Sequence, residues 1–286
     1  MTNLLKETLF LLKKYNIRPK KDLGQNFIIN SDIVERIIKY ANIDCNDVVL
    51  EIGAGLGTLT DKLAEYAKKV YAVEVDPKLC KVLNDRFSKV ENIEIVCEDV
   101  LKISFPSDFN KIVSNFPYSI ATPVTFKILD TSFQLAILMY QLDVAKRLIA
   151  QPGTKDYGRL TVAVHYKAEV HILEKVPKNA FYPKPKVDSA IVLLKPKTRT
   201  LEIVNERFFL NVVRDLFSYR NKVLKKALNL LFSRKRLKKE EVKRIIDILE
   251  KRKINHRKRV YTLSPAEFAE IANVIYFRAG EEFNEE

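Results

Sequence analysis

The sequence of 286 residues has few of the residue types that build metal sites and disulfides. It has no tryptophan and only three histidines and three cysteines, and none of them has the spacing of a metal site. A catalytic metal is therefore not expected. Because the number of cysteines is odd, we expect Cys45, Cys80 and Cys97 to be reduced and buried, as is typical of a cytoplasmic protein.

The sequence also lacks a long hydrophobic run. No uncharged apolar stretch reaches the roughly 18 residues that a membrane span needs, so no membrane partner is expected. The apolar run within residues 1–15 is interrupted by Lys6 and Glu7, which favours an amphipathic leading helix over a signal peptide.

Positive charge is concentrated in one part of the chain. The net charge is +14, and residues 214–259 contain 18 Lys/Arg against five Asp/Glu. Such a segment indicates a polyanionic partner, nucleic acid above all, although a solvated helix face would have the same composition. The candidate phosphate contacts are Lys184, Lys186, Arg220, Lys222, Lys235, Arg236, Lys238 and Lys239.

The first two thirds of the chain alternate short β-branched runs with helical patterns. This alternation predicts βαβ units and a parallel sheet with helices on both faces. The predicted strands are 47–53, 69–76, 92–100, 111–117 and 135–141, followed by a possible antiparallel pair, 170–177 and 187–196. Two of the helical patterns between them are 59–67 and 77–87.

Beyond Pro196 the pattern becomes helical throughout. Apolar residues three and four apart predict helices over 207–232, 238–254 and 264–277. Ser264 and Glu267 form a capping-box pattern at the start of the last one. We therefore expect two domains: an α/β domain of residues 1–197 and a small, basic, all-helical domain of residues 198–286.

Three of the seven glycines, Gly53, Gly55 and Gly57, fall within EIGAGLGTLT, between a predicted strand and a predicted helix. This position is typical of a nucleotide-binding turn. The spacing is G-x-G-x-G rather than the G-x-G-x-x-G of a dinucleotide site, and Glu51 precedes the first glycine. A carboxylate at that place favours a cationic ligand, S-adenosylmethionine, over a ligand with a diphosphate, such as NAD. This weakens the alternative interpretation of the chain as an NAD-dependent oxidoreductase.

Two further acids lie at the ends of the next two predicted strands. Glu74 is placed to accept hydrogen bonds from both ribose hydroxyls, as an acid does in dinucleotide folds, and Asp99 to accept from the adenine amino group. With Glu51 they would form a line of acids at the ends of three successive strands, along the carboxyl edge of the sheet. Together with the glycines, they favour a cofactor site there.

The fourth predicted strand leads into Asn115-Phe116-Pro117-Tyr118. The amino nitrogen of adenine is a poor nucleophile, and two acceptors aimed at its hydrogens would hold it for methyl transfer. The Asn115 side-chain oxygen is one, and the Phe116 carbonyl, fixed by the following proline, is the other. Tyr118 could stack on the base. The motif predicts methyl transfer to an adenine.

These motifs carry a family resemblance. NFPY resembles the N-[LIF]-P-Y motif of amino-adenine methyltransferases, with Phe116 where leucine is commoner. LGQNFI (23–28), the glycine turn, EDV (98–100) and AFYPKPKVDSAIV (180–192) resemble, in order and spacing, the small-subunit ribosomal RNA adenine dimethyltransferase family. The resemblance runs from about residue 18 into the C-terminal helices.

The resemblance implies a Rossmann-like S-adenosylmethionine-dependent methyltransferase with a helical C-terminal domain. It also implies transfer of four methyl groups to two adjacent adenosines near the 3′ end of small-subunit ribosomal RNA, with a role in small-subunit biogenesis. Phe181 would stack on the target adenine. The implied cofactor residues are Gln25, Asn26, Ile28, Glu51, Gly53, Gly55, Glu74, Val75, Asp99, Val100 and Asn115, and the implied catalytic residues are Asn115, Phe116, Pro117, Tyr118 and Phe181.

Two other functions share much of this pattern. Antibiotic-resistance methyltransferases that act on large-subunit ribosomal RNA have the same glycine turn and NFPY-type motif, and the C-terminal domain would discriminate them. An assembly or transcription factor could keep the fold without catalysis, but the intact Glu51, Asn115 and Phe181 argue against that, although they leave a second, non-enzymatic role in assembly open. Nothing in the sequence requires more than a monomer.

Overall fold

The computed structural model describes residues 4–20, 24–197, 201–235 and 239–283. The chain divides into two compact units. The first comprises Met1–Ala145 and Ala168–Pro196, and the second comprises Lys146–Lys167 and Lys197–Glu286.

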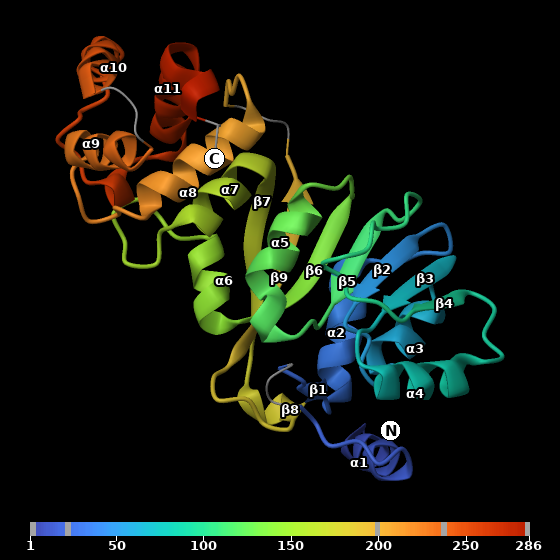
Figure 1. Cartoon of the computed structure of the whole chain (residues 1–286). Helices are drawn as coiled ribbons and strands as arrows, with labels where there is room; N and C mark the ends of the chain where they lie inside the picture. Colours follow the sequence, from blue (N-terminus) through green and yellow to red (C-terminus); the bar gives the residue numbers. More distant parts are fainter. Residues whose placement is uncertain (1–3, 21–23, 198–200, 236–238, 284–286) are drawn as a thin grey trace. The chain divides into compact units, whose positions relative to one another are not determined.

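A seven-stranded sheet forms the centre of the first unit, in the order β4-β3-β2-β5-β6-β9-β7 (Figure 1). The first five strands in that order are parallel, and β9 runs antiparallel to both β6 and β7. This mixed sheet confirms the predicted α/β class. The strands are β2 (Val48–Ile52), β3 (Lys69–Val73), β4 (Ile93–Val96), β5 (Lys111–Ser114), β6 (Leu135–Gln141), β7 (Ala168–Val176) and β9 (Ser189–Pro196).

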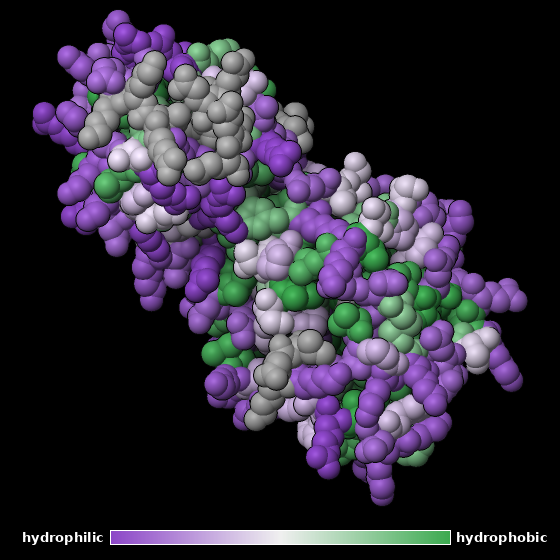
Figure 2. All heavy atoms as spheres, viewed as in Figure 1, coloured by the Kyte–Doolittle hydropathy of each residue, from purple (hydrophilic) through white to green (hydrophobic). Residues whose placement is uncertain are grey.

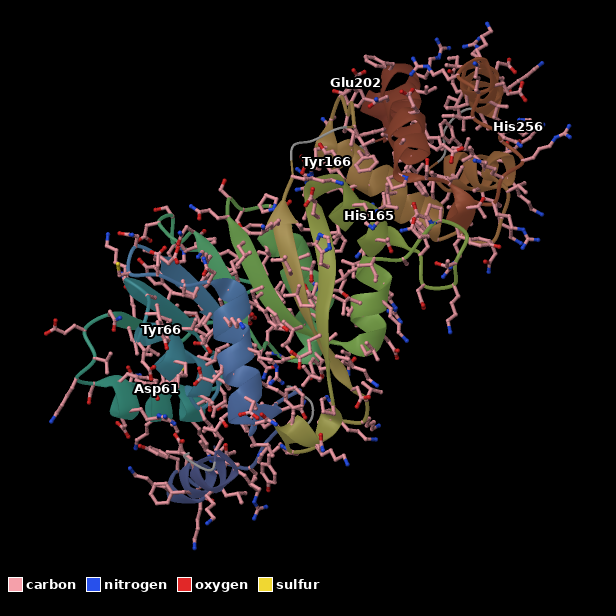
Figure 3. The ribbon with its side chains drawn as sticks, turned by 180° about the vertical axis from the view of Figure 1, so that it is seen from behind. Asp61, Tyr66, His165, Tyr166, Glu202 and His256 are labelled. Carbon is pink, nitrogen blue, oxygen red and sulfur yellow. The ribbon has the colours of Figure 1, made fainter. Side chains whose placement is uncertain are left out.

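Helices cover both faces of this sheet: α5 lies on the face toward the viewer in Figure 1, and α2 on the face toward the viewer in Figure 3. The sequence patterns predicted α1, α3 and α4 but not α2 or α5. These helices are α1 (Leu4–Lys14), α2 (Ser31–Ala41), α3 (Thr58–Ala64), α4 (Pro77–Phe87) and α5 (Ala121–Leu129).

A second, two-stranded sheet joins two motifs that are far apart in the sequence. Strand β1 (Phe27–Ile28) pairs antiparallel with β8 (Phe181–Tyr182), so that Ile28 lies opposite Phe181. The pattern of two apolar residues in each segment is too short to predict a strand. The pairing brings LGQNFI together with the FYPKPK segment.

The second unit consists of helices around one apolar core. The predicted helical stretch 207–232 is divided by a turn between α8 and α9. The Ser264 capping box is confirmed, because Ser264 N donates to Glu267 Oε2 at 2.8 Å and Glu267 N donates to Ser264 Oγ at 3.2 Å. The helices are α7 (Arg159–Lys167), α8 (Glu206–Phe217), α9 (Leu224–Arg234), α10 (Lys239–Lys251) and α11 (Pro265–Phe283), while α6 (Leu142–Leu148) spans the junction of the units.

The chain passes between the units three times, whereas the sequence analysis expected a single boundary after residue 197. Residues 146–167 belong to the helical unit because their apolar side chains lie in its core. Tyr166, labelled in Figure 3, packs edge-on against Phe209 of α8 with ring centroids 5.4 Å apart. The composition of the segment between β6 and β7 contains no sign of this excursion.

Two expectations about cysteine burial are wrong. Cys80 is buried, but Cys45 and Cys97 are exposed, because each follows rather than lies within a regular element. In the part of the chain that the structure describes, no helix is long and apolar enough to span a membrane.

Candidate active site

A cavity of about 220 Å³ lies in the first unit, where the glycine turn and the residues that follow β3, β4 and β5 meet. Its wall includes all eleven residues predicted to bind the cofactor, and also Pro117. Phe116, Tyr118 and Phe181 are not among the lining residues. The sequence analysis missed several apolar lining residues, namely Phe27, Leu56, Leu79, Leu101 and Ile120.

The glycine turn is in direct contact with the NFPY segment. Gly53 and Gly55 have φ values of 75° and 61°, which side-chain-bearing residues rarely adopt. A Cβ atom on Gly53 would lie 2.9 Å from Pro117 Cδ. Glycine at this position therefore lets Pro117 pack onto the turn.

The LGQNFI segment is the third part of this assembly. A Cβ on Gly24 would lie 3.2 Å from the Tyr118 backbone nitrogen, so this glycine also permits a close approach. Asn26 Nδ2 donates to the Gly24 carbonyl at 2.9 Å, and the Asn26 carbonyl accepts from Asn115 Nδ2 at 3.2 Å. Three motifs separated in sequence thus meet at one place.

The bond to Asn26 orients the Asn115 amide. Because its nitrogen is the donor in that bond, its Oδ1 remains as an acceptor at the cavity wall. The neighbouring Phe116 ring is 1% exposed and packs edge-on against Tyr140, with centroids 5.2 Å apart. This anchor and the following Pro117 fix the backbone that carries the Phe116 carbonyl.

Tyr118 is held by its hydroxyl group. The Tyr118 Oη and Ser189 Oγ atoms are 2.5 Å apart, and Ser189, at the start of β9, is fully buried. Burial raises the pKa of Tyr118 to about 12. The tyrosine is therefore a neutral positioning group at neutral pH, attached to the strand that follows FYPKPK.

The structure does not support the predicted stacking of Phe181 on a base. Its side chain is 2% exposed and belongs to a core cluster with Ile28, Ile33 and Ala180. An aromatic ring that is buried in this way offers no face to a nucleotide. The sequence could not distinguish the two roles, because β1–β8 pairing decides where the ring points.

Glu74 follows β3 and is held by three backbone donors. Its Oε2 accepts from Gly55 N, and its Oε1 accepts from Val75 N and Asp76 N, each at 2.9 Å. Burial raises the pKa of Glu74, and these donors oppose that rise because they favour the carboxylate. By count, a carboxylate accepts about four hydrogen bonds, so one position on Oε2 remains for a ligand.

Glu51 is deeply enclosed. It lies within β2, as the predicted strand 47–53 implied, and it is 2% exposed. Its Oε2 accepts from Thr60 Oγ1 at 2.6 Å. Burial raises the pKa of Glu51 to about 8, so the carboxyl is protonated at neutral pH in the absence of a nearby cation.

Gln25 has a structural role that the sequence did not indicate. Its Oε1 accepts from Lys20 N at 2.8 Å, and its Nε2 donates to Asp76 Oδ2 at 3.1 Å. Asp76 is also the N-cap of α4. The Gln25 side chain thus ties the LGQNFI segment to α4, although the residue lines the cavity.

The far wall of the cavity suits a flat, apolar group. Val75, Val100 and Leu101 contribute apolar surface, and Asp99 is half-buried beside them. Asp99 Oδ1 accepts from Leu101 N at 3.0 Å, and Asp99 Oδ2, which lies 3.8 Å from Lys102 Nζ, can still accept a hydrogen bond from a ligand. Leu101 directly follows the EDV motif, and this adjacency could have identified it from the sequence.

The charge of the cavity wall fits S-adenosylmethionine. Among the described lining residues there is no lysine or arginine, but there are four carboxyl groups: Glu51, Glu74, Glu98 and Asp99. Carboxylates repel a diphosphate, whereas they stabilise a sulfonium and an amino group. The residues present therefore fit this cofactor better than a dinucleotide.

The predicted phosphate contacts differ in accessibility. Lys184, Lys186 and Lys222 are exposed and Lys235 is half-buried, whereas Arg220 is half-buried and donates to the Lys155 carbonyl at 3.0 Å. Arg236, Lys238 and the Lys239 side chain lie outside the described residues. Hydrophilic side chains cover most of the coloured surface of the helical unit on the face shown in Figure 2.

Comparison with known proteins identifies the family to which these motifs correspond. Residues 16–276 match the family described as ribosomal RNA adenine dimethylase. A probable ribosomal RNA small subunit methyltransferase A of Methanosarcina acetivorans is 47% identical over 266 residues, which are 93% of this chain and 97% of the relative. A protein of the same description from Pyrococcus furiosus is 44% identical over 264 residues, which are 92% of this chain and 94% of that relative.

Two solved structures are similar over most of the chain. A dimethyladenosine transferase from Plasmodium falciparum has a TM-score of 0.74 at 30% identity and covers 90% of this chain and 98% of its own. The 23S rRNA methyltransferase ErmE has a TM-score of 0.64 at 29% identity, and the match covers 87% of this chain and 99% of ErmE.

Proposed function

The chain belongs to the ribosomal RNA adenine dimethylase family and is an adenine dimethyltransferase, and we propose which RNA it modifies. It transfers methyl groups from S-adenosylmethionine to the exocyclic amines of two adjacent adenosines near the 3′ end of small-subunit ribosomal RNA. It acts as a cytoplasmic monomer on that RNA or on an assembly intermediate of the small subunit.

The choice of the small subunit is supported by the comparisons. The relatives at 44–47% identity are described as small subunit methyltransferases. The 23S rRNA methyltransferase has a lower TM-score, 0.64, than the dimethyladenosine transferase, 0.74. A large-subunit substrate is therefore the second candidate, with the same chemistry at the same cavity.

One observation carries the proposed chemistry: Asn115 is oriented at the wall of a cavity whose lining is acidic. The cofactor would supply an electrophilic methyl group on a positively charged sulfur, which would leave as a neutral thioether when the carbon–sulfur bond breaks. Asn115 Oδ1 and the Phe116 carbonyl each accept one hydrogen of the target amine. The amine nitrogen is thereby held with its lone pair toward the methyl group. No strong base is needed, because water takes the proton after transfer.

Other residues bind the cofactor in this proposal. Glu74 accepts from a ribose hydroxyl at the remaining position of Oε2, and Asp99 accepts from the adenine amine beside Val100 and Leu101. Glu51 faces the cationic part of the cofactor and becomes ionised when that charge is present. The Asn26 carbonyl and Gly24 keep the LGQNFI segment against the NFPY segment.

The RNA must present an unpaired base to this cavity. A base inside a duplex cannot reach Asn115, so the substrate adenosines lie in a single-stranded segment or leave their stack. Lys184 and Lys186 are exposed in the turn between β8 and β9, where they can contact phosphates. Tyr118 is hydrogen-bonded to Ser189 at the start of β9, and this bond links the turn to the NFPY segment.

The test is to incubate the protein with labelled S-adenosylmethionine and undermethylated ribosomal subunits of both kinds. We expect the label in small-subunit RNA only. Label confined to large-subunit RNA would overturn the proposed substrate but keep the chemistry. No transfer to either RNA, from a protein that binds the cofactor, would contradict the enzymatic function.

A further inference from the structure

The segment between β4 and β5, residues 97–110, is a long connection without regular secondary structure. Three of its residues, Asp99, Val100 and Leu101, line the cavity. Its C-terminal end is bonded to the sheet, because Tyr71 Oη donates to Asp108 Oδ1 and Asn110 N donates to the Val48 carbonyl. Near the cavity its backbone hydrogen bonds are local: Lys102 N and Ile103 N both donate to the Asp99 carbonyl. Loops of this length are uncommon without a function, and the part that lines the cavity needs an anchor of its own to present a fixed wall.

Lys127 of α5 provides such an anchor. Its Nζ donates to the Val100 carbonyl at 2.5 Å and to the Ile103 carbonyl. The same atom lies 4.6 Å from the centre of the Phe105 ring. One half-buried ammonium group thus joins three residues of the loop to α5.

Helix α5 also contacts the neighbourhood of the NFPY segment. Thr125 Oγ1 is hydrogen-bonded to Tyr140 Oη at 2.7 Å, and the Tyr140 ring packs on Phe116. In addition, α5 begins at Ala121, directly after the short helix Tyr118–Ile120. The same helix therefore contacts the segment that holds the target amine and the loop that forms the far wall of the cavity.

We propose that Lys127 is a positioning residue for the cofactor. It fixes the loop at Val100 and Ile103, so that Asp99, Val100 and Leu101 form the wall against which the adenine of S-adenosylmethionine binds. Through α5, this wall keeps its place relative to Asn115. The inference rests on the proposed function in that S-adenosylmethionine is the ligand of this cavity.

A lysine is suited to this task for a physical reason. Its ammonium group has three donors on a flexible stem, so it can satisfy two carbonyls that point in different directions. Burial lowers the pKa of Lys127, while the nearby Asp99 opposes that change. A methionine at this position would keep the apolar stem but form neither hydrogen bond.

The experiment compares Lys127→Met with Lys102→Met. Lys102 is in the same loop, its side chain is 82% exposed, and its Nζ is 3.8 Å from Asp99 Oδ2, so the control removes a cation near the cavity without removing the anchor. We expect Lys127→Met to weaken S-adenosylmethionine at least tenfold by calorimetry, and Lys102→Met to weaken it less than threefold. Lys127→Arg, which keeps charge and donors, should recover most of the affinity.

Two further readouts separate positioning from general stability. In the protein without cofactor, hydrogen exchange of residues 99–105 should accelerate in Lys127→Met, while exchange in the sheet strands stays unchanged. In steady-state transfer, KM for the cofactor should rise at least tenfold and kcat at saturating cofactor should fall less than threefold. If Lys127→Met does not fold, Lys127→Gln, which keeps an uncharged amide donor on a shorter side chain, takes its place.

Wild-type-like cofactor affinity in folded Lys127→Met would overturn this inference. So would equally fast exchange throughout the first unit, because that would show a decrease in global stability instead. Failure of the proposed function is distinguishable, since it would show as absent cofactor binding or absent RNA methylation in the wild type.

Discussion

The cavity of the first unit and the surface of residues 214–259 in the second use charge in different ways. In the cavity, the polar groups have assigned partners: Glu74 has three backbone donors, Glu51 has Thr60, and Asn115 has Asn26. Polar groups fixed in this way suit the recognition of one small ligand.

On the helical unit, by contrast, the cations are mostly exposed. Some of them are ion-paired within the unit, as Arg244 is with Glu241 and Lys258 with Glu267. Others are exposed in a place that does not favour them: Lys225 and Lys226 lie in the first turn of α9, where the helix dipole disfavours positive charge. Such a surface attracts a polyanion with little discrimination, and its effect depends on salt. The number of Lys/Arg in a segment therefore overstates the number available to RNA.

The largest expected effect is that of Asn115→Ala. Removing one preorganised acceptor should raise the barrier to transfer by about 3 kcal/mol, which is roughly a hundredfold in kcat. Asn84→Ala is the control, because Asn84 is an exposed amide on α4, outside the cavity, that donates to the Cys80 carbonyl. Single-turnover transfer at saturating cofactor measures the effect. Similar rates for both variants would remove Asn115 from the mechanism.

The next effect is on cofactor affinity. Glu74→Ala should weaken S-adenosylmethionine by roughly 1.5–3 kcal/mol, since the variant cannot accept a charge-assisted hydrogen bond from the ribose. Glu98→Ala is the control, because Glu98 is an exposed acid of the same cavity wall. RNA affinity should not change in either variant. Calorimetry that finds equal decreases would mean that Glu74 contributes only negative charge.

A pH dependence follows from the raised pKa of Glu51, about 8. A bound cation favours its carboxylate, so cofactor binding releases a proton from Glu51. The affinity should therefore rise with pH between about 6 and 8, by up to about tenfold per unit, and level off above 8. Glu51→Gln should remove this dependence. An affinity of the wild type that is flat over this range would place the cationic groups away from Glu51.

The smallest effects are expected on the helical unit. Lys222, Lys225 and Lys226 are exposed. Changing all three to Gln should make the slope of log K for RNA binding against log salt concentration less steep, by about 0.7–0.9 for each phosphate that the variant no longer neutralises. The matched control neutralises the ion-paired Arg244, Arg252 and Lys258. Cofactor affinity should stay constant in both. An equal slope in wild type and the first variant would show that these lysines face only solvent.

These substitutions are preferable to deleting the helical unit. A fragment that ends near residue 197 would retain Tyr157, Val162 and Tyr166, whose side chains belong to the core of that unit. Their exposure would destabilise the fragment independently of any interaction with RNA.

The motifs predicted residues that the structure brings together at one cavity, because such a site requires particular residue types at fixed distances from strand ends. Gly53, Glu74 and Asn115 each follow a short β-branched run, and parallel strands bring their carboxyl ends to one edge. The sequence could not predict what depends on tertiary pairing. The burial of Phe181 results from β1–β8 pairing, and the placement of residues 146–167 results from packing against α8.

The central claim is that the protein dimethylates adenine at the cavity beside Asn115. The most direct measurement is mass spectrometry of nucleosides from undermethylated small-subunit RNA after incubation with the protein and S-adenosylmethionine. We predict N6,N6-dimethyladenosine at two adjacent positions with the wild type, and almost none with Asn115→Ala over the same time. Methylation at another atom or base, or dimethyladenosine formed equally by the variant, would contradict the account.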